Sequence, residues 1–205
     1  TSRSGGSRGS SAGWWGWAFF ANSAGIVRRV AASLAPSADS TSPGTAKPTR
    51  LFELFDALNA APKPAVVVMQ TLGPERSRTC MVGDVLSTIF QKLGAVGVVT
   101  DGGFRDLSGI RTHAPGFQIF SPGLVVSHGN STILDINVTV SVGGLVIQPG
   151  ELLHGDQNGV VSVPLAIAAQ VVEQVKTVWG QEQALMRYIQ SDKFSLDGLK
   201  QMMTH

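Results

Sequence analysis

Between residues 50 and 110, hydrophobic positions alternate between helical spacing and continuous runs. Helical spacing predicts helices over residues 51–58 and 84–93, the first ended by nearby prolines and the second by a glycine. Continuous valine-rich runs over residues 65–69 and 96–99 predict strands that are buried on both faces. Because strand, helix and strand follow one another, this stretch predicts a crossover unit of parallel sheet.

After residue 110 the hydrophobic runs become shorter and are divided by glycine and proline. The pattern predicts strands over residues 117–120, 136–142, 145–147 and 160–163. Apolar helical spacing then returns to the end of the chain and predicts helices over residues 165–178, 182–189 and 196–203. The sequence therefore predicts a mixed α/β fold.

The first 50 residues have a different composition, since Ser, Gly, Ala, Thr and Pro fill 33 of these positions. Such a composition does not build a core easily. An apolar stretch over residues 14–27 resembles a leader or anchor, but its 14 residues fall short of the roughly 20 that span a bilayer. We therefore predict a Gly/Ser/Ala-rich N-terminal arm over residues 1–49, one domain over residues 50–205, and no membrane association.

Charge and cysteine content narrow the classes of function. The formal charge of +2 divides into +5 over residues 1–50 (six basic, one acidic) and −3 over residues 51–205 (ten basic, thirteen acidic). The body therefore lacks the basic stripe of a nucleic-acid-binding protein. Cys80 is the single cysteine, which excludes an intrachain disulfide and favours a reducing, cytoplasmic location. A charged content of only 15% favours a surface partly buried in an oligomer.

Two polar clusters follow predicted strands. Asp101-Gly102-Gly103-Phe104-Arg105-Asp106 comes directly after the strand at 96–99, where ligands bind in open α/β sheets. Asp84 follows Gly83 at the start of a predicted helix, after a strand expected near residues 80–82. Each cluster by itself is more typical of a turn or a helix cap than of a catalytic group. A thiol nucleophile at Cys80 is not expected, because Cys80 lies in an apolar run without a neighbouring histidine.

The two clusters together resemble a known family signature. Gly83-Asp84, twenty residues and then Arg105-Asp106 are similar to the signature of the family that contains regulator of ribonuclease activity A (RraA) and the class II 4-hydroxy-4-methyl-2-oxoglutarate aldolases. The segment 94–106 resembles the family's G-x-x-G-V-V-x-D-G-x-x-R-D motif, and residues 137–164 resemble its closing strands. The resemblance extends over residues 50–190.

The resemblance implies a fold, an assembly and a metal. The fold is a three-layer β/β/α, swivelling-domain-like sandwich that assembles as a homotrimer or a hexamer, with active sites at subunit contacts. The family enzymes bind a divalent ion, Mg²⁺ or Mn²⁺, through the aspartate that matches Asp106 and otherwise mostly through water. Such a ligand set suits magnesium, which keeps several waters and takes one or two carboxylates.

The resemblance also assigns catalytic and substrate-binding residues. Arg105 matches the arginine that pairs with the pyruvyl carboxylate, and Asp84 matches the acid that orients a water for proton transfer. The backbone amides of Val85 and Leu86, at a helix start, match those that receive a substrate carboxylate. Glu182 is the candidate for an acid that a neighbouring subunit contributes.

Three functions remain open from the sequence. The first is a metal-dependent aldolase that releases pyruvate and also decarboxylates oxaloacetate, because both reactions leave the same enolate, which a metal stabilises. The second is a non-catalytic regulator that binds a ribonuclease or a helicase, and the third is a paralogue that keeps the core without the chemistry. A Schiff-base aldolase is disfavoured because Lys63 and Lys92 lie outside the motif.

The start of the chain departs from the family pattern. Family members begin with a helix and then a Gly-x-Ala-x-Thr-Val strand that completes the sandwich, and no such strand is identified before residue 50. Either the tryptophan-rich arm supplies a substitute for that strand, or the strand is lost or altered, which would expose a sheet edge or remove a pocket wall.

Overall fold

The computed structural model describes residues 26–34, 36–37, 49–73, 75–127 and 132–204. The chain divides into two compact units, Thr1–Ser162 and Val163–His205, which are described separately. The tryptophan-rich stretch of the predicted arm lies outside the described residues.

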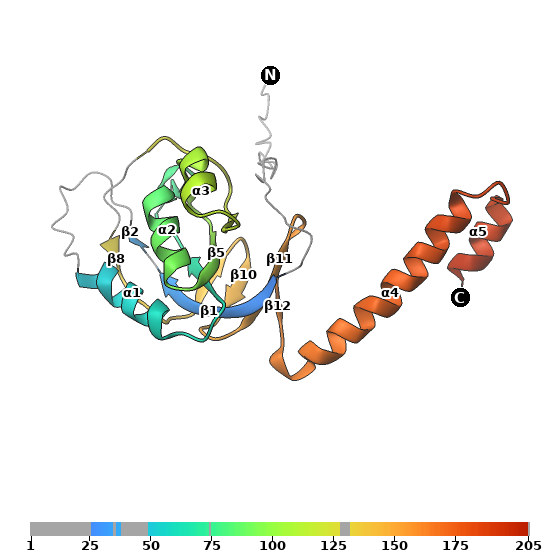
Figure 1. Cartoon of the computed structure of the whole chain (residues 1–205), viewed down its shortest axis with the longest axis horizontal. Coiled ribbons are helices and arrows are strands. Elements are labelled where there is room, and N and C mark those ends of the chain that lie inside the picture. The colour runs from blue at the N-terminus through green and yellow to red at the C-terminus, as the bar shows by residue number, and fades with distance from the viewer. Residues whose placement is uncertain (1–25, 35, 38–48, 74, 128–131, 205) are drawn as a thin grey trace, which may run out of the picture. The chain divides into compact units, whose positions relative to one another are not determined.

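The N-terminal unit is built on a six-stranded sheet of order β12-β11-β1-β3-β5-β7 (Figure 1). Strands β1, β3, β5 and β7 pair in parallel, and β11 pairs with β1 in the antiparallel sense. The bounds of the six strands are β1 (Ile26–Leu34), β3 (Ala65–Met69), β5 (Ala95–Thr100), β7 (Gln118–Phe120), β11 (Leu152–Asp156) and β12 (Gly159–Val163).

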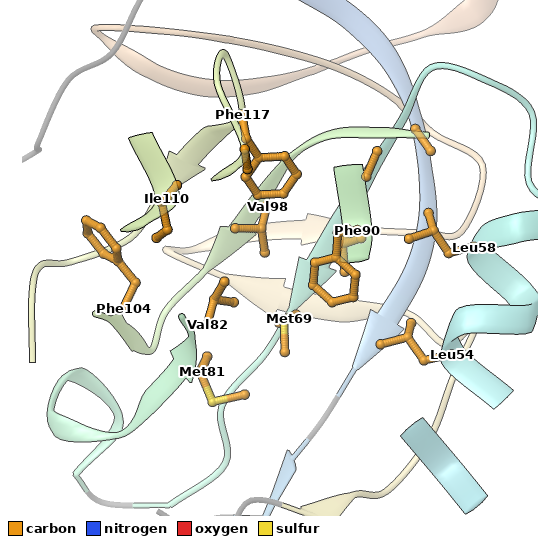
Figure 2. Packing of buried hydrophobic residues seen from close by; sticks show 14 residues of the cluster. Leu54, Leu58, Met69, Met81, Val82, Phe90, Val98, Phe104, Ile110 and Phe117 are labelled. Atoms are coloured by element: carbon orange, nitrogen blue, oxygen red, sulfur yellow. The ribbon is translucent and has the colours of Figure 1, made fainter. Parts of the chain in front are cut away.

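Three helices cover one face of this sheet: α1 (Thr49–Ala60), α2 (Asp84–Lys92) and α3 (Leu107–His113). One apolar cluster joins helices and sheet, and Figure 2 shows Leu54, Phe90 and Ile110 from the helices packed with Val98 and Met69 from the strands. The Phe55 ring also meets two other rings edge to face. Its centroid lies 6.3 Å from that of Phe52 and 6.4 Å from that of Phe90. The predicted helices over residues 51–58 and 84–93 are thus confirmed.

The opposite face of the sheet carries a second apolar cluster. Val68 and Val99 point to this face and pack with residues of the hairpin formed by β9 (Val140–Val142) and β10 (Leu145–Ile147). Neighbouring residues of β3 therefore face different clusters, since Val67 belongs to the first and Val68 to the second. This explains the continuous apolar run, and the prediction of strands buried on both faces is confirmed, as is the mixed α/β class.

Strand β1 is a finding that the sequence did not predict. It lies before residue 50, in the middle of the sheet, and pairs Arg29 with Leu152 of β11 and Val30 with Val66 of β3. The two consecutive arginines of its sequence interrupt the alternation of polar and apolar residues by which a strand is recognised. The chain therefore does have a strand between β11 and β3 where the sequence analysis identified none.

Several short elements complete the N-terminal unit. A two-stranded parallel pair consists of β4 (Cys80–Val82) and β6 (Gly103–Phe104), and β2 (Pro36–Ser37) pairs with β8 (Thr132–Ile133). A single 3-10 turn, η1 (Arg76–Arg78), precedes β4. The strand predicted over residues 136–142 is shorter in the structure, where only β9 forms.

The C-terminal unit contains the 3-10 turn η2 (Leu165–Ile167) and the helices α4 (Ala168–Ile189) and α5 (Leu196–Met203). The sequence predicts two helices over residues 165–189, and this prediction is wrong because α4 is continuous. Gly180 lies inside α4, where a glycine costs only about 1 kcal/mol relative to alanine and does not end the helix. Among the helices that the structure describes, none has the length and apolar character needed to cross a membrane.

Candidate functional site

Two parallel strands bring the two sequence clusters together. Strands β4 and β6 are neighbours, with Cys80 paired to Gly103 and Val82 to Phe104. Their carboxyl ends therefore lie at the same edge, where Gly83-Asp84 continues from one strand and Arg105-Asp106 from the other. The Arg105 amide donates to the Val82 carbonyl at 3.0 Å, which fixes the register at the point where both strands end.

Gly83 packs directly against both side chains of the second cluster. A Cβ atom at Gly83 would lie 2.7 Å from Asp106 Oδ2 and 3.3 Å from Arg105 Nε. The first distance is shorter than any ordinary van der Waals contact, so the missing Cβ makes room for the Asp106 carboxylate. The structure therefore places Arg105 and Asp106 at the Gly83 turn, as the sequence analysis predicts.

The Arg105 guanidinium is held at two of its nitrogens. Its Nε donates to Asp106 Oδ2 at 3.0 Å, and its Nη1 donates to the Ser127 carbonyl at 3.3 Å. The side chains of Arg105 and Asp106 are 29% and 40% exposed, so both remain accessible to a ligand from solvent. Solvent also screens this ion pair, which therefore contributes more to geometry than to stability.

Asp106 has an unusual backbone conformation. Its φ of 59° and ψ of 38° lie in the left-handed region, which non-glycine residues seldom adopt. The Asp106 carbonyl accepts from the Ile110 amide at 2.9 Å, so α3 begins immediately after this turn. Backbone strain of this kind clusters at functional sites.

Asp84 is the first residue of α2 and Gly83 is its N-cap. The alternative interpretation of Asp84 as the capping residue is therefore wrong. The Asp84 carboxylate accepts from the amide of the next residue, Val85, at 2.8 Å. A Cβ at Gly109 would lie 2.5 Å from Asp84 Oδ2, so the carboxylate also rests against α3.

The start of α2 presents backbone amides ahead of the first helical hydrogen bond. That bond runs from the Ser87 amide to the Gly83 carbonyl at 3.0 Å, so the amides of Val85 and Leu86 precede it. A helix start of this kind is suited to an anion. The Val85 amide is engaged by Asp84, and a substrate carboxylate at this amide has to displace that carboxylate.

Asp101 has a structural position. Its Oδ1 accepts from the Thr71 amide at 2.6 Å, and its Oδ2 lies 3.5 Å from Arg76 Nη1. The side chain is only 14% exposed. Asp101 therefore joins the ends of β3 and β5, and the turn interpretation of this residue agrees with its contacts.

Glu182 lies in α4 and is exposed. It belongs to the C-terminal unit, whereas the other predicted site residues belong to the N-terminal unit. The expected role of Glu182 in a neighbouring subunit's site stays a prediction.

The donor atoms of the site fit a magnesium ion better than a zinc ion. Within the described ranges, no three His, Cys, Asp or Glu residues are grouped so that they could hold a metal. Asp106 supplies one hard carboxylate, of which Oδ1 accepts no hydrogen bond from the residues described. A single accessible carboxylate suits Mg²⁺, which keeps its waters, whereas zinc takes three or four protein ligands.

Cys80 lies close to the site and is partly buried. Burial raises the pKa of its thiol, and the positive charge of Arg105 acts in the opposite direction. A raised pKa keeps the thiol neutral, which agrees with the prediction that Cys80 is not a nucleophile.

Ser127 is a contact of Arg105 that sequence reasoning missed. No sequence signal marks this contact, because it uses the backbone carbonyl of a residue in an irregular segment. The position of this carbonyl depends on the path of the chain after β7, which periodicity does not predict.

A comparison with protein families decides the relationship of the chain. A family model described as RraA-like, Aldolase/RraA, matches residues 20–162. The chain belongs to this RraA-like family. The match begins before residue 50 and includes strand β1, so only the part of the N-terminal segment from residue 20 onward lies within the matched region.

Individual relatives agree with this membership. A protein of Halalkalibacterium halodurans named "Putative 4-hydroxy-4-methyl-2-oxoglutarate aldolase" is 31% identical over 126 residues, which are 61% of this RraA-like chain and 59% of the relative. The chain thus spans about three fifths of the length of that relative.

Solved structures show the fold. Streptomyces coelicolor RraAS2, described as an unusual member of the RNase ES inhibitor RraA family, is 25% identical with a TM-score of 0.56, over 78% of this chain and 76% of RraAS2. An uncharacterized protein of Pseudomonas syringae is 22% identical with a TM-score of 0.63, over 89% of this chain and 78% of that protein.

Proposed function

We propose that this RraA-like chain is a divalent-metal-dependent aldolase that cleaves 4-hydroxy-4-methyl-2-oxoglutarate or a similar acid, releases pyruvate, and decarboxylates oxaloacetate as a side activity. The observation that carries the proposal is the packing of Arg105 and Asp106 against the Gly83 turn at the start of α2. The relative named as an aldolase supports the substrate class.

Arg105 is the proposed ligand of the pyruvyl carboxylate. Its Nε and Nη1 are already engaged by Asp106 and Ser127, so the plane of the guanidinium is set before substrate arrives. The remaining nitrogen, Nη2, makes no hydrogen bond to the described residues and is available to a carboxylate. Charge-assisted hydrogen bonds of this type are about twice as strong as neutral ones.

The start of α2 is the proposed site for the second carboxylate of the substrate. The Leu86 amide is one donor, and the Val85 amide becomes the other when the substrate displaces the Asp84 carboxylate. Displacement frees Asp84 to hold the water that takes the proton of the substrate's 4-hydroxyl. As the C3–C4 bond breaks, its electron pair passes to the pyruvyl half as an enolate, and the 4-hydroxyl carbon becomes a ketone. The water held by Asp84 then returns a proton to C3 of the enolate, which gives pyruvate.

Asp106 is the proposed protein ligand of the metal, with Mg²⁺ or Mn²⁺ as the cofactor. A divalent ion bound there would supply Lewis-acid stabilisation of the enolate charge. The chain's own contribution is to orient the carboxylate: the left-handed turn at Asp106 and the ion pair with Arg105 fix its direction.

The proposal includes assembly into a homotrimer or a hexamer. None of the described residues buries any part of helix α4 fully, and Val175, Val178 and Trp179 are 46%, 48% and 68% exposed. An exposed apolar surface of this kind is typical of a subunit contact. In such an assembly Glu182 would complete a neighbour's site, and the chain would adopt the three-layer β/β/α sandwich of the swivelling-domain type.

A pyruvate-release assay tests the function. Purified protein is incubated with Mg²⁺ and either oxaloacetate or 4-hydroxy-4-methyl-2-oxoglutarate, and pyruvate is measured through a coupled dehydrogenase. The proposal predicts release that disappears with excess chelator and returns with added Mg²⁺.

The same assay distinguishes the aldolase from the alternative function, a non-catalytic regulator. The similarity to RraAS2 supports that alternative. Absence of turnover by a folded protein that binds Mg²⁺, together with inhibition of a purified ribonuclease, would support the regulator and contradict the aldolase. Chelator-resistant pyruvate release would contradict the role of the metal.

A further inference from the structure

The segment after β7 returns along the outer side of β6. The Phe104 amide donates to the Gly123 carbonyl at 3.0 Å, and the Val125 amide donates to the Phe104 carbonyl at 2.8 Å. Residues 123–125 therefore pair with β6 on the side that does not face β4. This path brings Ser127 to the side of Arg105.

The Ser127 hydroxyl ties this segment to the start of β4. Its Oγ donates to the Arg78 carbonyl at 2.8 Å and accepts from the Cys80 amide at 3.2 Å. The Ser127 hydroxyl thus satisfies two backbone groups at the start of β4, the Arg78 carbonyl and the Cys80 amide. Removal of the hydroxyl leaves both groups without this partner, which is unfavourable wherever water cannot replace it.

The Ser127 carbonyl points the other way, to Arg105. It accepts from Nη1 at 3.3 Å, while Asp106 accepts from Nε at 3.0 Å. A planar guanidinium held at two nitrogens has a defined plane, and the direction of its third nitrogen follows from that plane. Ser127 therefore connects β4, from which Gly83-Asp84 continues, to the orientation of Arg105.

We propose that Ser127 is a positioning residue for Arg105: its hydroxyl anchors the 123–127 segment on β4, so that its carbonyl holds the guanidinium in the plane that receives a carboxylate. This role rests on the proposed function where substrate is concerned. The contact between Ser127 and Arg105 can be tested independently of any activity.

Cys80 provides that independent test, because it is the only thiol of the chain. Burial raises the pKa of this thiol, the positive charge of Arg105 lowers it, and the negative charge of Asp106 acts in the same direction as burial. If Ser127→Ala releases the guanidinium from its position, the pKa of the Cys80 thiol rises further, and alkylation by iodoacetamide slows at a fixed pH. Ser127→Thr keeps the hydroxyl and is expected to alkylate at the rate of the parent.

The Ser127 hydroxyl also contacts the Cys80 amide directly, so Ser127→Ala could change the alkylation rate without any movement of Arg105. A double-variant cycle separates this direct effect from the effect that passes through Arg105. The change caused by Ser127→Ala is measured in the parent and in an Arg105→Ala background, and the proposal predicts a clearly smaller change in the second. Ser141→Ala, at an exposed serine of β9, is the matched control and is expected to alkylate like the parent. An equal change in both backgrounds would overturn the proposal.

Binding of oxalate, a planar dicarboxylate resembling the pyruvate enolate, adds the ligand readout. With Mg²⁺ present, Ser127→Ala is expected to bind oxalate about tenfold more weakly, the equivalent of one hydrogen bond to a charged group, and Ser127→Thr is expected to restore binding. Where pyruvate release is detected, the loss should raise KM more than it lowers kcat.

The outcomes separate the two proposals. If the parent protein releases no pyruvate but the alkylation cycle still shows coupling between Ser127 and Arg105, the proposed function is contradicted. The positioning role of Ser127 is then supported. Normal pyruvate release with no coupling supports the function and overturns the inference. If Ser127→Ala does not fold, side-chain nitrogen NMR of Arg105 in the parent decides: separate, slowly exchanging Nη1 and Nη2 signals support the contact, and averaged signals contradict it.

Discussion

The turn region at the ends of β4 and β6 and the helix α4 differ in how closely their glycines are packed. At the turn, a Cβ on Gly83 would meet Asp106 at 2.7 Å, and one on Gly102 would meet Met81 at 2.2 Å. In α4, a Cβ on Gly180 would meet no neighbouring atom within 4 Å, and the helix buries no residue. The turn region is thus closely packed among the described residues, whereas α4 presents an apolar surface that none of the described residues buries.

This difference separates the region proposed for the chemistry from the region proposed for assembly. The turn holds its polar side chains in fixed positions, as a binding site requires. A groove lies along α4, and its apolar lining consists of Ile167 from η2 and Val171, Val175, Val178 and Trp179 from α4. This apolar groove has the character of a contact surface. Substitutions in the two regions should therefore affect different measurements.

The largest effect is expected at Arg105. Arg105→Ala removes the hydrogen bonds to the substrate carboxylate and should lower kcat/KM for pyruvate release at least about a hundredfold. Arg78→Ala is the matched control, since the Arg78 side chain is 81% exposed and only its backbone contacts Ser127. Equal activity of Arg105→Ala and the parent would remove Arg105 from the site.

A smaller effect is expected from Gly83→Ala. The new Cβ displaces the Asp106 carboxylate, so we expect roughly a tenfold or greater loss of activity and about 1 to 3 kcal/mol of lost stability, measured by chemical unfolding. The matched change in the other region is Gly180→Ala, which should raise stability by up to about 1 kcal/mol. A neutral Gly83→Ala would show that the turn is not closely packed.

The third prediction concerns α4. If copies of the chain cover this helix, Trp179→Glu places a charge in the contact and lowers the mass measured by light scattering from a multiple of 21.5 kDa to that of one chain. Thr177→Glu adds the same charge to an exposed position on the other side of the helix, outside the lining of the apolar groove, and should leave the mass unchanged. An unaltered mass for Trp179→Glu would place the contact elsewhere.

The fourth prediction compares thiols in the two regions. Because burial raises the pKa of the Cys80 thiol, alkylation of Cys80 should reach half its maximal rate at a higher pH than alkylation of an exposed cysteine. A Cys80→Ser, Gly180→Cys double variant provides that exposed thiol in α4. Coincident pH profiles would show that Cys80 is not desolvated.

The sequence predicted elements whose hydrophobic pattern is decided locally. The runs at residues 65–69 and 96–99 are buried strands because both faces of each are covered, and the spacing of Leu54 and Leu58 marks the buried side of α1. Strand β1 was missed because Arg28 and Arg29 interrupt its pattern, although its place in the middle of the sheet makes it a strand. Gly180 suggested a helix end that the surrounding helical residues override.

The part of the site that could be predicted from the sequence is the part formed by the residues of the family motif. The resemblance of Gly83-Asp84 and Arg105-Asp106 to the family signature implied that they meet, and the parallel pairing of β4 with β6 is the reason they do. The engagement of the Val85 amide by Asp84 and the contact of Ser127 with Arg105 depend on side-chain and loop geometry, which no spacing encodes. The relation of Glu182 to the site depends on assembly.

Oxalate binding in the presence of Mg²⁺, measured by calorimetry for the parent, Arg105→Ala, Asp106→Asn and the double variant, tests most directly whether Arg105 and Asp106 act together on a metal and a 2-oxo acid. The account predicts binding by the parent, loss with chelator, strong weakening in each single variant, and little further loss in the double variant. Binding by Asp106→Asn at the strength of the parent, with or without Mg²⁺, would contradict it.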